Sequence, residues 1–295
     1  MRAARLHELG GTPRVDEVDV PRGEQLLEVT ASSLNPVDIS IANGRFYGGT
    51  PDTPYVIGSE AVGRLPDGRR VWHQARGSMA ERVAVTPDKA VEVPQGVGDA
   101  LALACGIAGL TGWLAVSWRA PVGPDDTVLV LGASGTVGGT AVQGAKLLGA
   151  KRVVGVARRT ENIPAVADEV IAINGSETYP AATVIVDVLW GSPLERAFAA
   201  ASHGVRVVQV GQSAGPTAAL ESGWVRGKVA NILGHSLFAV PPDALAAGYR
   251  ELAGHARDGD LQFETESYDL EQIGEAWEHQ SSGSAGTKIV VAVAE

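Results

Sequence analysis

The stretch TVLVLGASGTVGGTAVQGAKLLGA (127–150) decides the fold of this chain. It begins with an uninterrupted apolar run, passes through a turn with glycines at positions 132, 135 and 138, and ends in a pattern typical of a helix. A strand with a continuous apolar run is buried on both of its faces. The stretch therefore predicts one strand and one helix of a parallel sheet that helices cover on both sides.

Five further apolar runs follow this stretch, and several pairs of them leave room for a helix in between. Strands that alternate with helices in this way predict a doubly wound, Rossmann-type α/β domain, which we place at residues 98–266. The runs are RVVGVA (152–157), EVIAI (169–173), TVIVDVL (183–189), VRVVQVG (205–211) and VANILGH (229–235).

The chain before this domain has a different rhythm. Short apolar or alternating runs separated by turn signals predict a β-rich, partly barrel-like unit, and no helix is predicted in about the first 95 residues. The run KIVVAVA (288–294) has no evident partner in the Rossmann sheet, so we expect it to return to the β-rich unit. The second predicted domain therefore comprises residues 1–97 and 267–295. We also expect helices at 241–255 and 270–280.

Composition argues against several classes of protein. The 295 residues carry 24 Lys and Arg against 34 Asp and Glu, and the net charge of −10 disfavours binding to nucleic acid and to anionic membranes. The single cysteine, Cys105, cannot form an intramolecular disulfide, and no apolar leader opens the sequence, so we expect a cytoplasmic protein. The uncharged run 100–118 is nearly long enough to span a bilayer, but its glycines favour a buried helix.

The glycine turn is a candidate phosphate-binding site. Glycines let the backbone approach a pyrophosphate, which would lie against the N–H groups at the helix N-terminus. Arg158 and Arg159 follow the next strand, where an acidic residue would bind the ribose 2′-hydroxyl of NAD and an arginine accommodates a 2′-phosphate. The sequence therefore predicts NADPH as cofactor, with two solvated arginines as the alternative. The cofactor residues predicted at the turn are Gly132, Ser134, Gly135, Thr136, Val137 and Gly138.

Motifs of three other enzyme classes were compared with the sequence. Short-chain dehydrogenases need a tyrosine followed four residues later by lysine, and none of the five tyrosines has that partner. A P-loop motif does not occur either. The segment 211–215 matches the G-x-S-x-G pattern of hydrolases, but a hydrolase would leave the glycine turn and the two arginines unexplained. We expect this loop to approach a nicotinamide instead.

Four motifs occur in order along the chain: SLNPVD (33–38), PYVIGSE (54–60), GLTGW (109–113) and the glycine turn. Together they resemble the medium-chain dehydrogenase/reductases, specifically their zinc-independent quinone oxidoreductase branch. The resemblance implies an oxidoreductase with a GroES-like, β-rich catalytic domain beside the Rossmann domain. It also implies a homodimer, for which we nominate the predicted strand at 229–235.

The resemblance further implies roles for particular side chains. It places Asn35 beside the nicotinamide and the substrate carbonyl, with Tyr47 and Tyr55 lining the pocket, and these three are the predicted catalytic residues. Asn35 offers an amide donor and each tyrosine a phenolic one. The structural alternatives are a turn at Asn35 and a core aromatic at Tyr55. The further implied cofactor contacts are Asn35, Thr111, Val188, Leu189, Val210, Gly211, Ser213, His235 and Ser236.

The residues that bind catalytic zinc in other members of the superfamily are replaced here. Those members use a cysteine near position 38 and a Gly-His-Glu triplet, whereas this chain has Gly58-Ser59-Glu60 and no cysteine before Cys105. We therefore expect no metal. Without a Lewis acid, the hydride acceptor is expected to delocalise charge by itself, as a quinone or an α,β-unsaturated ketone does. The alternative function is a non-catalytic NADPH-binding sensor or structural protein.

Overall fold

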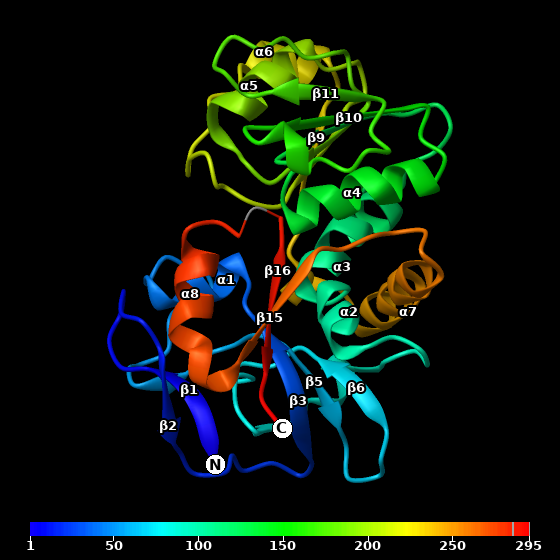
Figure 1. The fold of residues 1–295 in the computed structure, drawn as a ribbon. Coiled ribbons are helices and arrows are strands. Elements are labelled where there is room, and N and C mark those ends of the chain that lie inside the picture. The colour runs from blue at the N-terminus through cyan, green and yellow to red at the C-terminus, as the bar shows by residue number, and fades with distance from the viewer. Residues whose placement is uncertain (285, 295) are drawn as a thin grey trace. The chain divides into compact units, whose positions relative to one another are not determined.

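The computed structural model describes residues 1–284 and 286–294, and Figure 1 shows its fold. The chain forms two compact units: unit 1 comprises Met1–Ala108 with Pro241–Glu295, and unit 2 comprises Gly109–Val240. These boundaries differ from the predicted ones at 97/98 and 266/267. The segment after Pro241 belongs to unit 1, where Tyr249 stacks on Trp72 with ring centroids 4.8 Å apart. The catalytic and cofactor-binding roles of the two domains stay predictions.

Unit 2 contains the predicted parallel sheet. Its strands follow the order β11-β10-β9-β12-β13-β14, and every neighbouring pair is parallel. The order runs outward in both directions from β9, which is the doubly wound arrangement. The Rossmann prediction is therefore confirmed. The strands are β9 (Thr127–Leu131), β10 (Arg152–Ala157), β11 (Glu169–Ala172), β12 (Val184–Asp187), β13 (Arg206–Gln209) and β14 (Asn231–Gly234).

Helices bury both faces of this sheet. Alternate residues of β9 point to opposite faces, so Val128 and Val130 share a core with α4 (Thr136–Leu147), whereas Leu129 and Leu131 share one with α5 (Gly191–Ala200). Between β10 and β11 the chain forms only a 3₁₀ turn, Thr160–Asn162, in the short segment for which the sequence leaves little room. Unit 2 also contains the short α6 (Ser222–Gly227), a 3₁₀ turn at Leu237–Ala239 and the helical segments between Gly109 and Arg119 described below.

Unit 1 is built from two sheets. The smaller has the order β2-β1-β4, and the larger has the order β15-β16-β3-β5-β6-β8, with β7 also paired to β3. The last run of the sequence, β16, pairs antiparallel with β3, which confirms that it returns to the β-rich unit. The strands are β1 (Arg2–Leu6), β2 (Arg14–Glu17), β3 (Leu26–Ser33), β4 (Tyr55–Val56), β5 (Ala61–Arg64), β6 (Arg70–His73), β7 (Arg82–Ala84), β8 (Ala90–Glu92), β15 (Thr265–Asp269) and β16 (Lys288–Ala292).

One prediction for unit 1 was wrong. No helix was expected in its first 95 residues, yet Pro36–Ala42 forms α1. Pro36 occupies the first helical turn, where its missing N–H costs nothing, and Asp38 accepts a hydrogen bond from the backbone N–H of Asn35 over 2.8 Å. Further helical segments are α2 (Asp99–Ala104), α7 (Pro242–Asp258), α8 (Ile273–Ser281) and 3₁₀ turns at Pro87–Lys89 and Leu270–Gln272.

The uncharged run 100–118 is largely buried, as predicted, but it is not one helix. It comprises α2, α3 (Ile107–Leu114) and a π-helical turn at Ala115–Arg119, with a break at Cys105-Gly106. In the described part of the chain, no helix combines the length and apolar character that crossing a bilayer requires.

Candidate functional site

The glycine turn of unit 2 joins β9 to α4 and depends on two glycines. Gly132 has a φ of +88°, and a Cβ there would lie 2.2 Å from Cγ2 of Val188. A Cβ on Gly138 would lie 2.2 Å from the carbonyl oxygen of Gly132. No larger residue fits either position without displacing the backbone or a strand-end side chain. The turn therefore holds the beginning of α4 close against the end of β9.

The turn has the features of a phosphate cradle. Gly135 caps α4 without a side chain, and an added Cβ there would meet only the oxygen of Gly132, at 3.8 Å. The first helical turn contains Thr136, Val137 and Gly138, and the N–H groups at a helix N-terminus point toward a ligand that lies there. Ser134 lies half-buried in the same turn. These residues fit the pyrophosphate of a dinucleotide, which favours such N–H groups and the positive end of the helix dipole.

Arg158 and Arg159 follow β10, the strand next to β9 in the sheet. Both residues are exposed, and no hydrogen bond or ion pair joins either one to another described residue. Their guanidinium groups therefore have donors to offer to a ligand. An arginine at the end of this strand suits a 2′-phosphate, because its planar fork matches phosphate oxygens.

The other predicted cofactor residues of unit 2 follow the carboxyl ends of strands on the same sheet edge. Val188 and Leu189 follow β12, and Val210 and Gly211 follow β13. The two loops are joined, because Ser213 donates its backbone N–H and its hydroxyl to the carbonyl of Val188. The structure thus brings these residues together at the edge where ligands of open α/β sheets bind.

His235 and Ser236 follow β14, and His235 is bonded to the helix that carries Thr111. Its Nε2 lies 3.1 Å from the Thr111 carbonyl oxygen, and because a carbonyl only accepts, Nε2 carries the proton. Burial, opposed by the hydrogen bond to Thr111 and aided by the nearby charge of Arg119, lowers the pKa of His235 to about 4. His235 is therefore neutral near pH 7.

Asp187 at the end of β12 is a buried carboxyl group that the sequence analysis did not single out. Its Oδ1 accepts hydrogen bonds from the backbone N–H groups of Leu189 and Trp190, while Oδ2 has no partner among the described residues. Burial raises the pKa of Asp187 to about 6, and the two backbone bonds oppose that rise. The carboxyl shapes the loop that follows β12.

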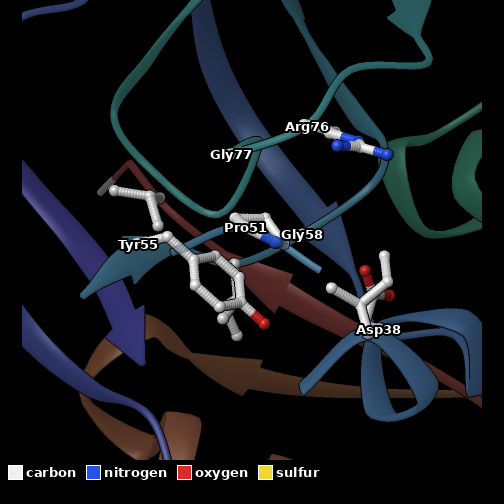
Figure 2. Close-up of a pocket in the computed structure, with 9 residues that line it drawn as sticks. Asp38, Pro51, Tyr55, Gly58, Arg76 and Gly77 are labelled. Atoms are coloured by element: carbon white, nitrogen blue, oxygen red, sulfur yellow. The ribbon is translucent and has the colours of Figure 1, made fainter. Parts of the chain in front are cut away.

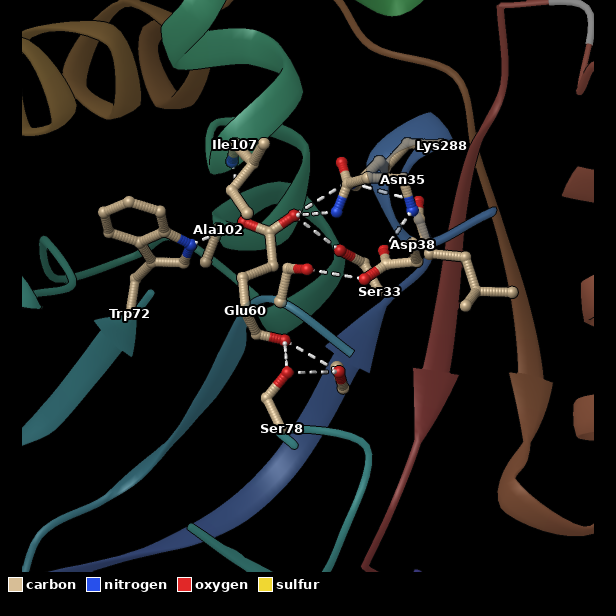
Figure 3. Close-up of polar contacts among 12 residues, drawn as sticks. Ser33, Asn35, Asp38, Glu60, Trp72, Ser78, Ala102, Ile107 and Lys288 are labelled. Atoms are coloured by element: carbon tan, nitrogen blue, oxygen red, sulfur yellow. Dashed lines mark hydrogen bonds and ion pairs between the residues drawn. The ribbon is translucent and has the colours of Figure 1, made fainter. Parts of the chain in front are cut away.

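In unit 1, Asn35 belongs to a buried polar network centred on Glu60 (Figure 3). The Asn35 amide nitrogen donates to Oε1 of Glu60 over 2.9 Å, and the Lys288 ammonium donates to Oδ1 of Asn35 over 2.5 Å. Lys288 also donates to Oε1 of Glu60 over 2.8 Å. The loop before α1, the loop before β5 and the first residue of β16 supply these three side chains.

Glu60 accepts hydrogen bonds at both of its oxygens. Ser33, Asn35 and Lys288 donate to Oε1, while the Trp72 indole and the backbone N–H of Ile107 donate to Oε2 over 2.7 Å each. Burial alone would raise the pKa of Glu60, but the ammonium of Lys288 and these hydrogen bonds hold it below its ordinary value. The carboxylate is therefore ionised and paired inside the core.

Tyr55 lines a small pocket of unit 1 together with Asp38 and Arg76 (Figure 2). The pKa of Tyr55 is raised to about 12, mainly by burial and further by the charge of Asp38, so its phenol keeps its proton. Asp38 accepts hydrogen bonds from Ser59 and from the backbone N–H of Asn35. The pocket is thus lined by one phenol, one exposed arginine and one carboxyl group.

Tyr47 differs from the other two predicted catalytic residues. It is 81% exposed, contacts Phe46 with ring centroids 4.6 Å apart, and does not line the pocket that contains Tyr55.

Cys105 is fully buried, and burial raises its pKa to about 12. Its thiol is therefore neutral and shielded.

The sequence analysis missed Lys288 and the role of Glu60. Lys288 is the only charged residue in the run KIVVAVA, and a lone charge at the start of a strand that is otherwise apolar is a signal of a buried partner. Glu60 was noted only as part of the Gly-Ser-Glu triplet. Among the described residues, no three His, Cys, Asp or Glu side chains are grouped so that they could hold a metal ion.

Comparisons with known proteins agree with this architecture. The human quinone oxidoreductase is 29% identical, over 97% of this chain and 96% of its own length. The mouse quinone oxidoreductase is 31% identical, over 72% of this chain and 73% of its own length. The solved structure of the quinone oxidoreductase from Thermus thermophilus, which was also determined in complex with NADPH, is 25% identical with a TM-score of 0.82, over 99% of this chain and 100% of that one. A scan against family models finds no match.

Proposed function

We propose a function from one premise: the chain belongs to the quinone oxidoreductase branch of the medium-chain dehydrogenase/reductase superfamily. It is an NAD(P)H-dependent oxidoreductase. We propose that it transfers hydride from NADPH to a quinone or an α,β-unsaturated ketone without a catalytic metal. The observation that carries the proposal is the glycine turn at the N-terminus of α4, followed on the neighbouring strand by two exposed arginines.

NADPH is the cofactor that the unit 2 residues fit. The first turn of α4 would hold the pyrophosphate, and Arg158 and Arg159 would hold the 2′-phosphate. The loops at Val188, Leu189, Val210, Gly211 and Ser213, with Thr111, His235 and Ser236, would contact the rest of the cofactor. The quinone oxidoreductase from Thermus thermophilus, whose structure was also determined in complex with NADPH, supports this assignment.

When bound, NADPH would supply a hydride, one hydrogen with two electrons, to the conjugated carbon of the acceptor and would thereby be oxidised to NADP⁺. The charge that develops on the acceptor oxygen needs hydrogen-bond donors fixed in advance. Asn35 provides an amide N–H, and Tyr55 provides a phenol that stays protonated because its pKa is about 12. We assign Asn35 the bond to the acceptor oxygen, and water supplies the proton that completes the reduced product.

The proposal of a metal-free reaction is supported by the donor set around Glu60. Both carboxylate oxygens accept hydrogen bonds from protein donors, and Ser59 donates its hydroxyl to Asp38 over 2.6 Å. Both carboxyl groups thus accept hydrogen bonds from protein donors. A quinone or enone delocalises the incoming charge by itself and so needs less polarisation than a simple ketone.

We further propose that the enzyme is a cytoplasmic homodimer that pairs through β14. This strand is the last in its sheet, so one of its edges has no strand partner among the described residues. It exposes Ile232, which is 42% exposed, next to Val229, which is 60% exposed. An exposed apolar edge strand is a template for pairing with a second copy.

The proposal is tested by following NADPH oxidation at about 340 nm, an experiment that reports hydride transfer directly. Purified protein is given NADPH or NADH with quinones, enones and simple ketones, with and without a chelator. We expect turnover with NADPH on conjugated acceptors that the chelator does not change. Chelator-sensitive reduction of simple ketones would overturn the metal-free assignment, and NADPH binding with no oxidation of any acceptor would favour the non-catalytic sensor.

A further inference from the structure

The surroundings of Asn35 determine which way its amide points. An ammonium can only donate hydrogen bonds and a carboxylate can only accept them. The group that faces Lys288 is therefore the amide oxygen, at 2.5 Å, and the group that faces Glu60 is the amide nitrogen, at 2.9 Å. A flipped amide would oppose two donors on one side and two acceptors on the other. The two charges fix one orientation.

This orientation leaves one N–H of Asn35, a residue that is 1% exposed, without an acceptor among the described residues. The amide nitrogen has two hydrogens, and the described residues offer an acceptor, Glu60, to only one of them. The backbone of Asn35 is held as well, because its N–H donates to Oδ2 of Asp38 over 2.8 Å. The second N–H of the side chain therefore points in one fixed direction.

Lys288 itself has no donor left for a substrate. Its three ammonium hydrogens match three acceptors, which are Oδ1 of Asn35, Oε1 of Glu60 and the carbonyl of Leu34 at 3.5 Å. Its side chain is only 2% exposed. Glu60 is equally committed, because Gly106 packs against it so closely that an added Cβ would lie 2.0 Å from Oε2. Neither Lys288 nor Glu60 can form a hydrogen bond to a substrate without breaking one that it already makes.

We propose that Lys288 is a positioning residue of the reductase: with Glu60, it fixes the Asn35 amide so that an N–H, rather than a carbonyl, meets the acceptor oxygen. The inference rests on the proposed function for the identity of that acceptor. Lys288 acts through Asn35 and donates no proton. A preorganised donor costs no reorientation when charge develops on the acceptor oxygen, and this is the condition under which such a donor accelerates a reaction.

The first test exchanges the two groups while keeping the charges. In the double variant Asn35→Asp/Glu60→Gln, one carboxylate, one amide and one ammonium remain, but position 35 has no N–H to offer. Because the amide nitrogen introduced by Glu60→Gln opposes donors that Glu60 accepted from, the melting temperature and NADPH binding are measured first to establish that the variant is folded. In the folded variant we expect kcat to fall about 10²- to 10³-fold, the loss typical of removing one such donor. A kcat within about twofold of that of the wild type would overturn the proposal.

The second test removes the cation. Lys288→Met is expected to lower kcat about 10²-fold through misplacement of Asn35, with little change in KM for NADPH, and Lys288→Arg is expected to recover part of the loss. Lys151→Met, which changes an exposed lysine of unit 2, is the matched control. If Lys288→Met does not fold, Lys288→Met/Glu60→Gln removes both charges and is measured instead. Wild-type kcat in the variant that folds would contradict the proposal.

A third measurement needs no turnover. In ¹⁵N-labelled protein, the side-chain amide of Asn35 is identified by its loss in Asn35→Ser. We expect one of its protons to be shifted by the bond to Glu60 and the pair to move in Lys288→Met but not in Lys151→Met. An unchanged Asn35 amide would overturn the positioning role. If this signature is present but the wild type reduces no acceptor, the proposed function fails while the fixed amide stands.

Discussion

The Ser59 hydroxyl donates a hydrogen bond to Oδ1 of Asp38 over 2.6 Å, and neither side chain is more than 4% exposed. Burial is the largest influence on Asp38 and raises its pKa to about 6, although the bonds from Ser59 and Asn35 and the charge of Lys288 act in the opposite direction. Asp38 therefore takes up a proton in the folded protein at a pH where an unfolded aspartate is already ionised.

This pKa predicts a pH-dependent stability. The native state binds more protons than the unfolded state between about pH 4 and pH 6, so the contribution of Asp38 falls as pH rises through that window and is lost above it. Asp38→Asn keeps both hydrogen bonds, because its amide can donate to Ser59 and accept from Asn35. Between about pH 4 and pH 6, the free energy of unfolding of the variant should fall less than that of the wild type, by up to about 3 kcal/mol.

The measurement compares melting temperatures of the two proteins at pH 4.5 and pH 7.5. Asp187 and His235 also titrate near this window, so the quantity of interest is the difference between the wild type and Asp38→Asn. Asp125→Asn, which changes an exposed aspartate of unit 2, serves as the control. Parallel pH profiles for wild type and Asp38→Asn would contradict the raised pKa.

Removing Lys288 should make stability depend on pH in the same direction. Without the ammonium, less remains to offset the effect of burial, so the pKa of Glu60 rises. The ionised carboxylate then destabilises the folded state most at high pH. Breaking a buried ion pair typically costs about 3–5 kcal/mol, and we expect Lys288→Met to lose that amount at pH 8 and less at pH 5. Thermal unfolding at both pH values measures it, and a loss that is equal at the two would refute the prediction.

Arg158 and Arg159 should set the preference between the two dinucleotides. A hydrogen bond to a charged group is worth about 1.5–3 kcal/mol, so Arg158→Ala and Arg159→Ala should each raise KM for NADPH about 10- to 100-fold. KM for NADH should barely change, because NADH has no 2′-phosphate. Arg250→Ala, an exposed arginine of α7, is the control. An equal rise for both dinucleotides would show that the arginines do not bind the 2′-phosphate.

His235 should act as a neutral hydrogen-bond donor. Its pKa of about 4 means that it gives no inflection in a pH profile of activity between pH 6 and 8. His235→Gln can still donate to the Thr111 carbonyl, whereas His235→Phe removes this hydrogen bond at a cost of about 0.5–1.5 kcal/mol. Melting temperatures of the two variants provide the comparison. Equal melting temperatures would mean that the bond to Thr111 contributes nothing.

The β14 edge should carry the contact between two copies. Ile232→Lys places a charge on an apolar edge residue and should convert the proposed dimer into monomers in sedimentation velocity. Val170→Lys is the matched control, because Val170 is 46% exposed on β11, the opposite edge of the same sheet. Dissociation by the Val170 change alone would assign the interface to the other edge.

Much of the fold could be predicted because its signals are local. The stretch 127–150 contains a strand, a turn and a helix in consecutive residues, and each apolar run after it became a strand. The family resemblance is confirmed by the mouse relative. In contrast, α1 was missed because Pro36 and the Asp38 bond start a helix of only seven residues, too short for a periodic pattern.

The candidate site was less accessible to sequence reasoning because its contacts are long-range. Asn35 was singled out, but the residues that hold it were not, since Lys288 lies 253 residues away and meets it only through the pairing of β16 with β3. Asp187 gave no signal, because its surroundings depend on how the loop after β12 turns back. Burial and partner geometry, which no local pattern encodes, decide the roles of these groups.

Unit 1 is formed by two separate segments of the chain, and this determines the order in which the two units can be completed during synthesis. Unit 2 is continuous from Gly109 to Val240, so a ribosome releases all six strands of its sheet before it makes β16. Domains generally fold as units during synthesis. Until Lys288 has been synthesised, Glu60 lacks the ammonium that pairs with it, and the Asn35 amide lacks the donor that fixes its orientation. The buried charge network of unit 1 is therefore completed only after the last strand has been synthesised.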